Sequence, residues 1–437
     1  MRIKDKLAAL GKTFKFDSHH AIQRFGAFFG ALVVSGVLVL TTTGFSALMA
    51  DRDNLAETAL WTKTFTTSKT QLSGDVDGVY TNELKNRVLV MMHFDERAKI
   101  SYNAEDYEAF LLGSDGKLNS ETLDTPGVTG SFHVFGATGY VGVVLEGESC
   151  FDQQVLNLTI RANEELSFTD QQAAGDSADQ VIGDASFVKY DQWRVFFNPG
   201  ASGTTPIAAL ESRTFDPARA FYEVVLKADE EQVRVELDTK LAEMRTNQSQ
   251  INSYSDDLVT TKVDGLFLRP PTVPSIIDGD EVLGDSAAEA EDGVSTLALD
   301  ATEVVPGGFD FDWRSGNVYD GYLNDLVGEG QSYVDYLQTM ASESSNTGEN
   351  PSGIGDIEWI LSNGKSLTAD YRTSDVTMRP LMTVMNNLAQ AYQEYYANKS
   401  VYQSDLLLDL LALEVDLRDV RSNSTVNADE GFLVTYY

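Results

Sequence analysis

An uncharged apolar stretch near the N-terminus constrains this chain most. Residues 25–50 read FGAFFGALVVSGVLVLTTTGFSALMA and include no Asp, Glu, Lys or Arg. A helix of about 20 apolar residues spans the hydrocarbon core of a bilayer, where lipid offers backbone groups no hydrogen-bond partner. The stretch therefore predicts a single transmembrane helix. The alternative is a cleaved signal peptide, although its apolar region is normally only about 7–15 residues long.

The residues that precede this stretch predict its orientation. The basic side chains of residues 1–24 are Arg2, Lys4, Lys6, Lys12, Lys15 and Arg24, and the only acidic ones are Asp5 and Asp17. Because a positive flank stays in the cytoplasm, we expect a plasma-membrane protein with a short cytoplasmic segment at residues 1–24 and residues 51–437 outside the cytoplasm. A cleaved signal peptide would export the same residues.

Small residues mark one face of the predicted membrane helix. Gly26 and Gly30 lie four positions apart, a spacing that lets two helices approach closely. We interpret this face as a possible helix–helix contact, while noting that glycine is common in membrane helices in any case.

The part of the chain beyond residue 50 is strongly acidic. The 437 residues carry a formal net charge of −35 although the N-terminal segment is basic. Nucleic acid requires a basic surface, so we expect no nucleic-acid partner. Cys150 is the single cysteine, so no disulfide can form within the chain and its cores must be sufficient for folding. These features are compatible with a bacterial or archaeal envelope protein.

Residues 51–205 predict a β-rich domain. Short runs of β-branched and aromatic residues alternate with clusters of Gly, Asp and Asn. The runs are Leu60–Thr67, Arg87–His93, Ala98–Tyr102, Glu108–Leu112, Ser131–Phe135, Tyr140–Leu145, Val155–Arg161 and Ser186–Phe197. Their close spacing, mostly without helical patterns between them, favours an antiparallel sandwich or partial barrel.

Two further segments predict long helices. The first lies within residues 206–262. Asp216 and Pro217 have the pattern of a helix start, Val233 and Val235 alternate as in a strand, and apolar residues then follow a four-three spacing, so we expect a helix from about Asp229 to Leu258. The second covers residues 379–422. Its seam is Leu381, Met385, Leu388, Tyr392, Tyr395, Lys399, Tyr402 and Leu406, after which the pattern shifts by one residue to Leu410.

The two helices can pair in two ways. We favour an antiparallel, coiled-coil-like hairpin within one chain, because both partners are covalently linked and their effective concentration is high. The alternative is a contact between subunits, in which the polar Lys399 would set register or partner number. The predicted fold class is therefore α+β, with a membrane helix, an antiparallel β-sandwich-like domain and a long helical hairpin.

The remaining segments give weaker patterns. Residues 263–318 are acidic and contain Pro and Gly, so we expect a linker or loop. Residues 319–378 predict a small helical or irregular segment. Residues 423–437 end in a β-prone tail that can add an edge strand to the β domain or to a neighbour.

The sequence lacks the common catalytic signatures. His93 and His133 are the only histidines beyond residue 50, and no G-x-S-x-G, H-E-x-x-H, paired C-x-x-C or Walker motif occurs. We interpret both histidines as ordinary sheet residues. A non-enzymatic protein is the favoured interpretation.

Calcium is the one cofactor with any support, because hard cations bind carboxylates spaced along turns. The candidates are Asp75, Asp77, Asp310 and Asp312. The run from Asp75 does not complete an EF-hand loop, since its twelfth position is Asn86 where a bidentate Glu is needed. Solvated acidic turns without metal are the favoured alternative.

The topology and the missing catalytic motifs lead to a functional expectation. We expect a non-catalytic structural or assembly component of a bacterial envelope or surface apparatus of the transfer, secretion or adhesion type. Its partners would be the membrane and either other proteins or further copies of itself. The alternative is a cell-wall or glycan-directed binding protein or hydrolase that uses the β-rich domain.

Overall fold

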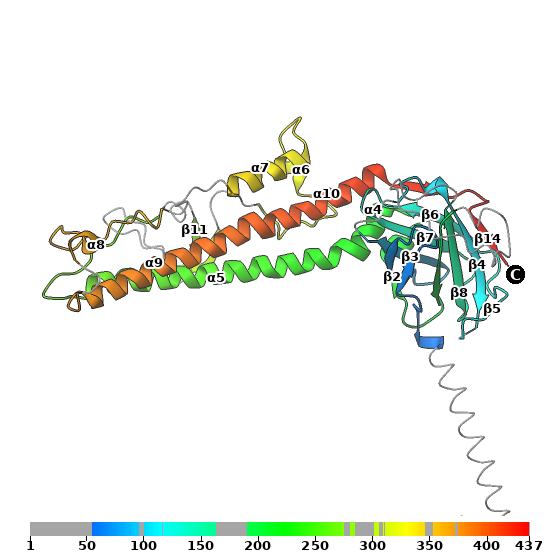
Figure 1. Ribbon diagram of the computed structural model, residues 1–437, viewed down its shortest axis with the longest axis horizontal. Helices are drawn as coiled ribbons and strands as arrows, with labels where there is room; N and C mark the ends of the chain where they lie inside the picture. The colour runs from blue at the N-terminus through cyan, green and yellow to red at the C-terminus, as the bar shows by residue number, and fades with distance from the viewer. Residues whose placement is uncertain are drawn as a thin grey trace, which may run out of the picture.

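The computed structural model describes residues 55–95, 100–115, 117–162, 190–274, 280–284, 301–305, 309, 311–345, 353–371 and 375–436. The predicted membrane helix with Gly26 and Gly30, the cytoplasmic segment and Asp310 lie outside these residues. Among the helices of the described ranges, none is both long and apolar enough to cross a membrane. The described chain forms a β domain from which two long helices project (Figure 1).

The first sheet of the β domain follows the order β1-β2-β3-β7-β6-β13, with β10 beside β2. Neighbouring strands are antiparallel, except that β10 runs parallel to β2. The strands are β1 (Thr64–Thr66), β2 (Ser73–Thr81), β3 (Arg87–Phe94), β6 (Thr129–Val134), β7 (Tyr140–Glu146), β10 (Thr205–Pro206) and β13 (Thr425–Asn427).

The second sheet follows the order β14-β4-β8-β9, with β5 beside β4. Its strands are β4 (Tyr107–Ser114), β5 (Ser120–Glu121), β8 (Val155–Ala162), β9 (Gln192–Phe197) and β14 (Leu433–Thr435). The C-terminal strand β14 runs parallel to β4. The β-prone tail thus adds an edge strand to the chain's own β domain.

One apolar core joins the two sheets. Trp193 of the second sheet lies edge-on to Phe94 of the first, with ring centroids 5.4 Å apart. Tyr107 and Phe132 stack across the same interface at 4.4 Å. Large aromatic side chains bury much apolar surface, so we expect this layer to contribute strongly to the stability of the β domain.

The structure contains one strand that the sequence does not predict, and it lacks a strand at another place where the sequence predicts one. Ser73–Thr81, which contains Asp75 and Asp77, forms β2 instead of an acidic turn. The strand buries Val76 and, after the register shift between Val76 and Gly78, also Val79, whereas Asp75 and Asp77 are exposed. Packing of the apolar face therefore overrides the turn-like composition. The run 98–102 was expected to be a strand, but its described part, residues 100–102, is not one.

Two continuous helical stretches form the pair of long helices. The outgoing stretch comprises α4 (Pro217–Phe221), the π-helical turn η4 (Tyr222–Leu226) and α5 (Lys227–Thr260). The returning stretch comprises α9 (Arg379–Ser400), the π-helical turn η5 (Val401–Leu406) and α10 (Leu407–Asn423). At about 1.5 Å per residue each is roughly 65 Å long. The α+β class, with antiparallel sheets and two long helices, is confirmed.

The outgoing helix begins at Asp216 and Pro217, where the sequence predicts a helix start, and continues without a break through Asp229. Asp216 caps it by accepting a hydrogen bond from the Ala218 amide, and Pro217 occupies the first turn. The strand-like alternation of Val233 and Val235 lies inside α5, because helix propagation from a capped nucleus outweighs a short local pattern.

A π-helical turn accounts for the shift in the second seam. The turn η5 covers Val401–Leu406, directly before the point where the apolar spacing slips by one residue. A π-helical turn inserts one extra residue into an α-helix. The buried face therefore continues from Leu406 through Leu410 to Leu417 without turning away from the partner helix.

Smaller elements lie against the helical pair. They are the antiparallel strands β11 (Glu281–Gly284) and β12 (Ala301–Val305), and the helices α6 (Leu323–Leu326), α7 (Tyr333–Ser345) and α8 (Leu367–Asp370). Short 3₁₀ turns are η1 (Ala104–Asp106) and η3 (Ala208–Leu210). The segment expected to be a linker differs from that expectation, because it contains β11 and β12 and buries Trp313 and Val318 in the apolar core of the helical pair.

The helical pair is an insertion in the β domain. The chain leaves the domain after β10 and returns to it with β13 and β14 (Figure 1). The tail that follows α10 pairs with both sheets, and Phe432 is buried in the core that they share. The start of the outgoing helix and the end of the returning helix are therefore both fixed to the β domain.

Candidate functional site: the interior and root of the helical pair

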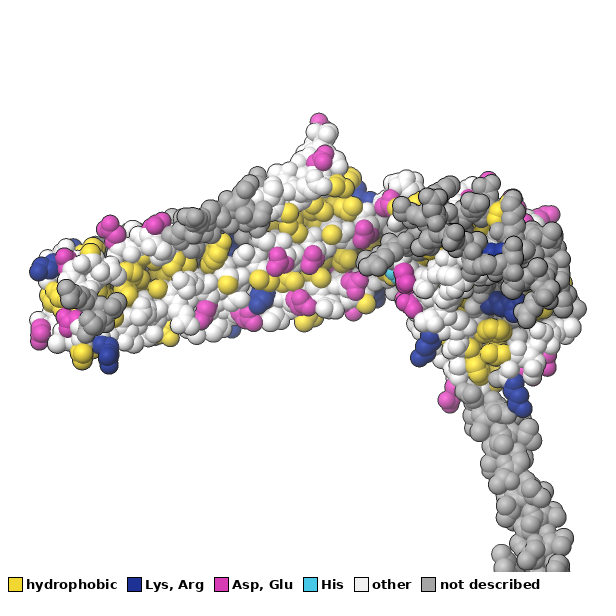
Figure 2. Space-filling model, viewed as in Figure 1, with side chains coloured by type: hydrophobic (Ala, Val, Ile, Leu, Met, Phe, Trp, Pro, Cys, Tyr) yellow, Lys and Arg dark blue, Asp and Glu magenta, His cyan; other side chains and the backbone are white. Residues whose placement is uncertain are grey.

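The seam between the long helices is apolar over most of its length. The buried members of the predicted set are Leu381, Leu388, Tyr392, Tyr395, Tyr402 and Leu406, while Met385 is half-buried. Their partners on α5 include Leu237, Leu241, Met244 and Ile251. On the face of the pair that Figure 2 shows, hydrophobic side chains form patches with Asp and Glu side chains among them.

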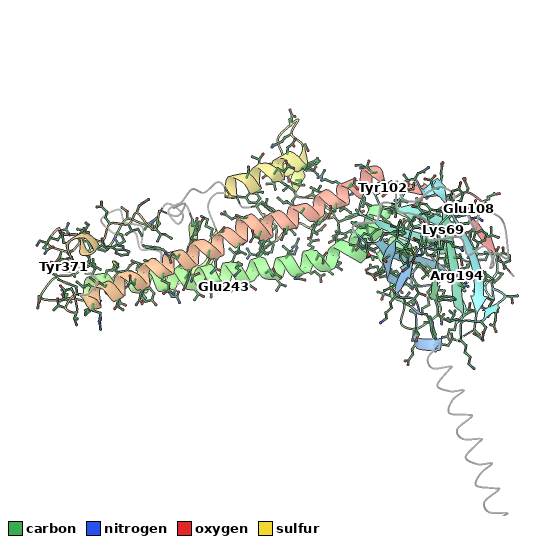
Figure 3. All side chains as sticks on the ribbon, viewed as in Figure 1. Lys69, Tyr102, Glu108, Arg194, Glu243 and Tyr371 are labelled. Atoms are coloured by element: carbon green, nitrogen blue, oxygen red, sulfur yellow. The ribbon has the colours of Figure 1, made fainter. Side chains whose placement is uncertain are left out.

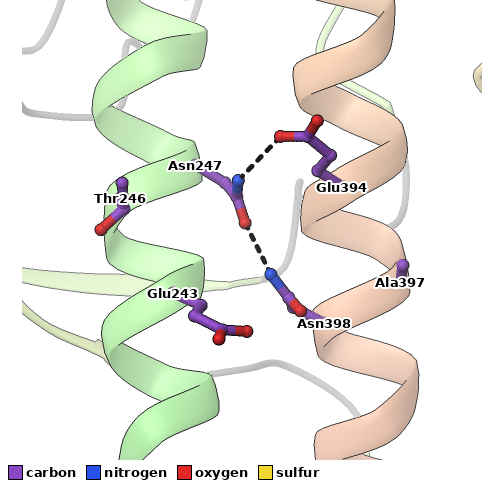
Figure 4. A pocket seen from close by; sticks show the side chains of 6 residues that line it. All are labelled: Glu243, Thr246, Asn247, Glu394, Ala397 and Asn398. Carbon is purple, nitrogen blue, oxygen red and sulfur yellow. Dashed lines mark hydrogen bonds between the residues drawn. The ribbon is translucent and has the colours of Figure 1, made fainter.

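Amide side chains connect the two helices near the middle of the pair. Asn398 donates a hydrogen bond to the Asn247 side chain at 2.9 Å, and Asn247 donates to Glu394 at 3.4 Å (Figure 4). The buried Gln248 donates to the Tyr395 hydroxyl at 3.3 Å. Such bonds can form in only one register, so they align two otherwise repetitive surfaces.

These amides border a hollow of 370 Å³ on the surface of the pair. Its lining residues are Glu243, Thr246, Asn247, Glu394, Ala397 and Asn398 (Figure 4). The hollow is shallow, and its polar groups are largely engaged with one another, so we assign it no ligand.

Lys399 is the charged member of the seam, and its partner is in the same chain. Its Nζ lies 2.5 Å from an Asp280 carboxylate oxygen, and both side chains are buried. The Tyr395 hydroxyl donates to the same carboxylate. Burial raises the pKa of Tyr395, and the neighbouring Asp280 raises it further, so this hydroxyl stays protonated and acts as a donor.

A buried glutamate on α5 holds the loop that leads into α6. Glu230 accepts hydrogen bonds from Arg234 at 2.7 Å, from the Tyr222 hydroxyl at 2.9 Å and from the Val318 amide at 3.1 Å. Arg234 also donates to the Tyr322 hydroxyl and to the Gly316 carbonyl. The carboxylate is thus fully paired despite its burial.

A second buried glutamate, on α10, holds the same loop from the other helix. Glu414 accepts hydrogen bonds from the Tyr322 amide at 2.5 Å and the Leu323 amide at 2.9 Å. Arg418 binds the other oxygen of Glu414. Each long helix therefore contributes a Glu–Arg pair four residues apart, and the two pairs grip residues 316–323 between them.

The π-helical turn η5 faces the start of this loop. The Trp313 indole donates to the Tyr402 hydroxyl at 3.0 Å, and Gln403 donates to the Phe309 carbonyl at 2.8 Å. We name the loop residues 309 and 311–323, with Glu230, Arg234, Glu414 and Arg418, the root clamp. It ties the outgoing and returning helices together near the β domain.

The sequence carried a signal for the root clamp that pattern reading missed. Glu230 and Arg234, and again Glu414 and Arg418, form an E-x-x-x-R spacing in which the acid falls at a buried position. An ion pair at this spacing usually lies on a solvated helix face. Only burial of the acid would have distinguished these pairs from surface ones.

The calcium candidates do not converge. Asp75 and Asp77 lie on β2, where the register is interrupted between Val76 and Gly78. Desolvation raises the pKa of Asp77, against the opposing effect of His93. Asp312 instead binds the Ser315 amide and hydroxyl, which lowers the pKa of its carboxyl group. The described residues contain no group of three or more His, Cys, Asp or Glu side chains arranged to hold a metal ion.

The two histidines lie in strands of the first sheet. His93 on β3 stacks on Tyr140 with centroids 4.2 Å apart. His133 on β6 is buried beside Phe215, and burial lowers its pKa to about 4. Ser131 and His133 share a hydrogen bond of 2.9 Å between Oγ and Nε2.

No protein-family model matches this chain, and searches of curated proteins and of solved structures found no match.

Proposed function

We propose that this protein is a non-catalytic structural or assembly component of a bacterial envelope or surface apparatus of the transfer, secretion or adhesion type. In this proposal a β-sandwich-like domain carries a coiled-coil-like stalk formed by the two long helices. The stalk presents its surface to protein partners or to further copies of the chain.

The observation that supports this proposal most is a stalk about 65 Å long. Interior polar groups of this stalk are bound to one another within the chain. The charged interior residues Glu230, Lys399 and Glu414 are each paired within the chain. Buried ion pairs add little net stability but are costly to break singly, so they favour one arrangement over others. A projecting element with one fixed arrangement suits a spacer or a scaffold.

The anchoring part of the proposal rests on residues 25–50. Their length and lack of charge support one membrane-spanning helix with the N-terminus in the cytoplasm. The acidic remainder would then lie outside the cytoplasm. Gly26 and Gly30 are the proposed place for a second contact, between membrane helices.

The test is co-purification of the full chain from native membranes in mild detergent. Val235 on α5 is 66 % exposed, and Leu84 of the β domain is 72 % exposed, so they form a matched pair. We expect Val235→Glu to reduce recovery of partners or further copies, while Leu84→Glu retains it.

Two results would contradict this proposal. One is recovery of the unaltered chain from native membranes as a monomer without partners. The other is binding to isolated cell-wall polysaccharide with no protein partner, which would favour the alternative of a glycan-directed function.

A further inference from the structure

A pocket lies where the helical stalk joins the β domain. It has a volume of 520 Å³, within the range of about 300–1,000 Å³ that is usual for small-molecule sites. One face of β6 and β7 lines it, at Thr129, Ser131, His133, Val144 and Glu146. These alternate positions share one face of the first sheet, away from the core between the sheets.

The other walls are the two segments that connect the β domain with the stalk, which we call the outgoing crossing and the returning crossing. Residues 213–215 and 217 belong to the outgoing crossing, and residues 424–426 and 428 to the returning one. The pocket therefore contacts the first sheet, the segment that enters the outgoing helix and the segment that leaves the returning helix. An occupant would touch three parts of the molecule that are far apart in sequence.

The pocket includes a buried histidine, one of whose ring nitrogens lacks a hydrogen-bond partner among the described residues. The Nδ1 atom of His133 has no hydrogen-bond partner in the part of the chain that the structure describes. Its other ring nitrogen is engaged with Ser131. Because an unpaired buried polar atom costs stability, such atoms often mark a place where water or a ligand group binds.

Two arginines of the lining have different roles. Arg87 is used within the protein, since it binds Glu146 at 2.5 Å and donates to the Leu210 and Ser212 carbonyls. Arg213 comes directly after Ser212, in the outgoing crossing, and is exposed. Its side chain makes no hydrogen bond or ion pair with the described residues. A guanidinium available at a pocket rim suits a carboxylate, which it binds through two parallel hydrogen bonds.

We propose that this pocket binds a small organic carboxylate, with Arg213 pairing with the carboxylate and Ser131 and His133 forming the polar floor. With Arg87 neutralised by Glu146, the free charge of the lining is that of Arg213. This is a positive site in a chain of net charge −35. Occupancy would stiffen the joint, because the ligand bridges both crossings and the sheet.

The experiment is ligand-observed NMR and calorimetry on the full chain in detergent micelles. The probes are acetate, succinate and citrate, with dimethyl succinate as the neutral counterpart of succinate. We expect saturable binding of at least one carboxylate and none of the diester. Arg213→Gln should weaken binding about tenfold or more, because a charge-assisted hydrogen bond is lost.

The matched control is Arg194→Gln. Arg194 is also exposed and lies in β9 of the second sheet (Figure 3), so this variant changes net charge equally without touching the pocket. Unchanged binding in this variant supports the proposal. Equal weakening in both variants would show unspecific charge attraction, and absence of saturable binding of all three carboxylates would also overturn the proposal.

A spectroscopic readout separates binding from a change in folding. In the chain with ¹³C-labelled histidine, succinate should shift the His133 ring signals and leave those of His93 in place, since His93 is outside the lining. Shifts of both histidines, or of neither, would contradict the assigned position.

Discussion

The core between the two sheets and the seam between the two helices differ in the charged groups that they bury. Between the sheets the core is apolar and aromatic, with Phe94, Tyr107 and Trp193 in contact. Between the helices it includes buried charges, at Lys399 and Glu414. The difference follows from how each structure fixes its register.

In a sheet, a slip by one residue moves every side chain to the opposite face, so the hydrophobic pattern alone specifies the pairing. Two helices with a repeating seam can slide by a turn at much smaller cost. Polar ties such as Asn247 to Asn398, and Glu414 to residues 322–323, remove that freedom. The stalk thus has polar contacts that specify its register, whereas in the β domain the hydrophobic pattern already specifies it.

Removing the central aromatic residue of the β domain should have the largest effect. Trp193 is 3 % exposed and contacts the rings of Phe65 and Phe94. Trp193→Ala leaves a cavity and should lower the free energy of unfolding by about 4 kcal/mol. Urea denaturation followed by circular dichroism measures it. A loss below about 1 kcal/mol would mean that the aromatic layer does not contribute strongly to the stability of the domain.

Breaking the root clamp should cost nearly as much. Glu414→Ala leaves Arg418 and two buried amides without their acceptor, so we expect a loss of about 3 kcal/mol in the free energy of unfolding. Faster hydrogen exchange at residues 316–323 should accompany it.

The control for the clamp is Glu243→Ala. Glu243 is exposed on α5 (Figure 3) and pairs with Lys240 at 2.7 Å, and surface pairs contribute about 0–1 kcal/mol. Similar losses in the two variants would remove the distinction between the buried and the surface pair.

Acid should weaken the junction between the two regions. The pKa of His133 falls from its ordinary 6.5 to about 4 because the ring is buried. Above pH 6.5 the ring is neutral in both states, and as the pH falls toward 4 only the unfolded chain gains the proton. Stability should therefore decrease over this interval by roughly 2–3 kcal/mol more in the unaltered protein than in His133→Gln.

Thermal unfolding between pH 7 and pH 4 measures this difference. Other carboxylates titrate in the same interval, so the quantity that matters is the gap between the two proteins. Parallel pH profiles would show that His133 is not the group responsible.

Replacing both members of the Lys399–Asp280 ion pair should change the free energy of unfolding least. Lys399→Met combined with Asp280→Asn removes both charges, and such exchanges are often neutral or slightly stabilising, within about 1 kcal/mol. The expected effect is loss of specificity, seen as faster hydrogen exchange in β11 and β12, the element that Asp280 precedes. Unchanged exchange there would mean that the ion pair does not position this element.

The sequence predicted the elements better than their polar contacts. The four-three spacing found the second long helix and its buried face, including Tyr395 and Tyr402, because helix periodicity is local. It did not find β2, whose Asp and Gly residues resemble a turn. Nor could it pair Lys399 with Asp280, since 119 positions separate them.

The sequence by itself determined the class of the molecule, which is an acidic α+β chain without an internal disulfide. The spacing of its apolar residues also determined the seam of the stalk. The tertiary structure alone decided which polar residues are buried and what they bind. Glu230 and Glu414 read as ordinary helix-surface acids until the loop at residues 316–323 packs on them. The reason is physical: periodicity acts between neighbours along the chain, whereas burial of a charge depends on which distant segment covers it.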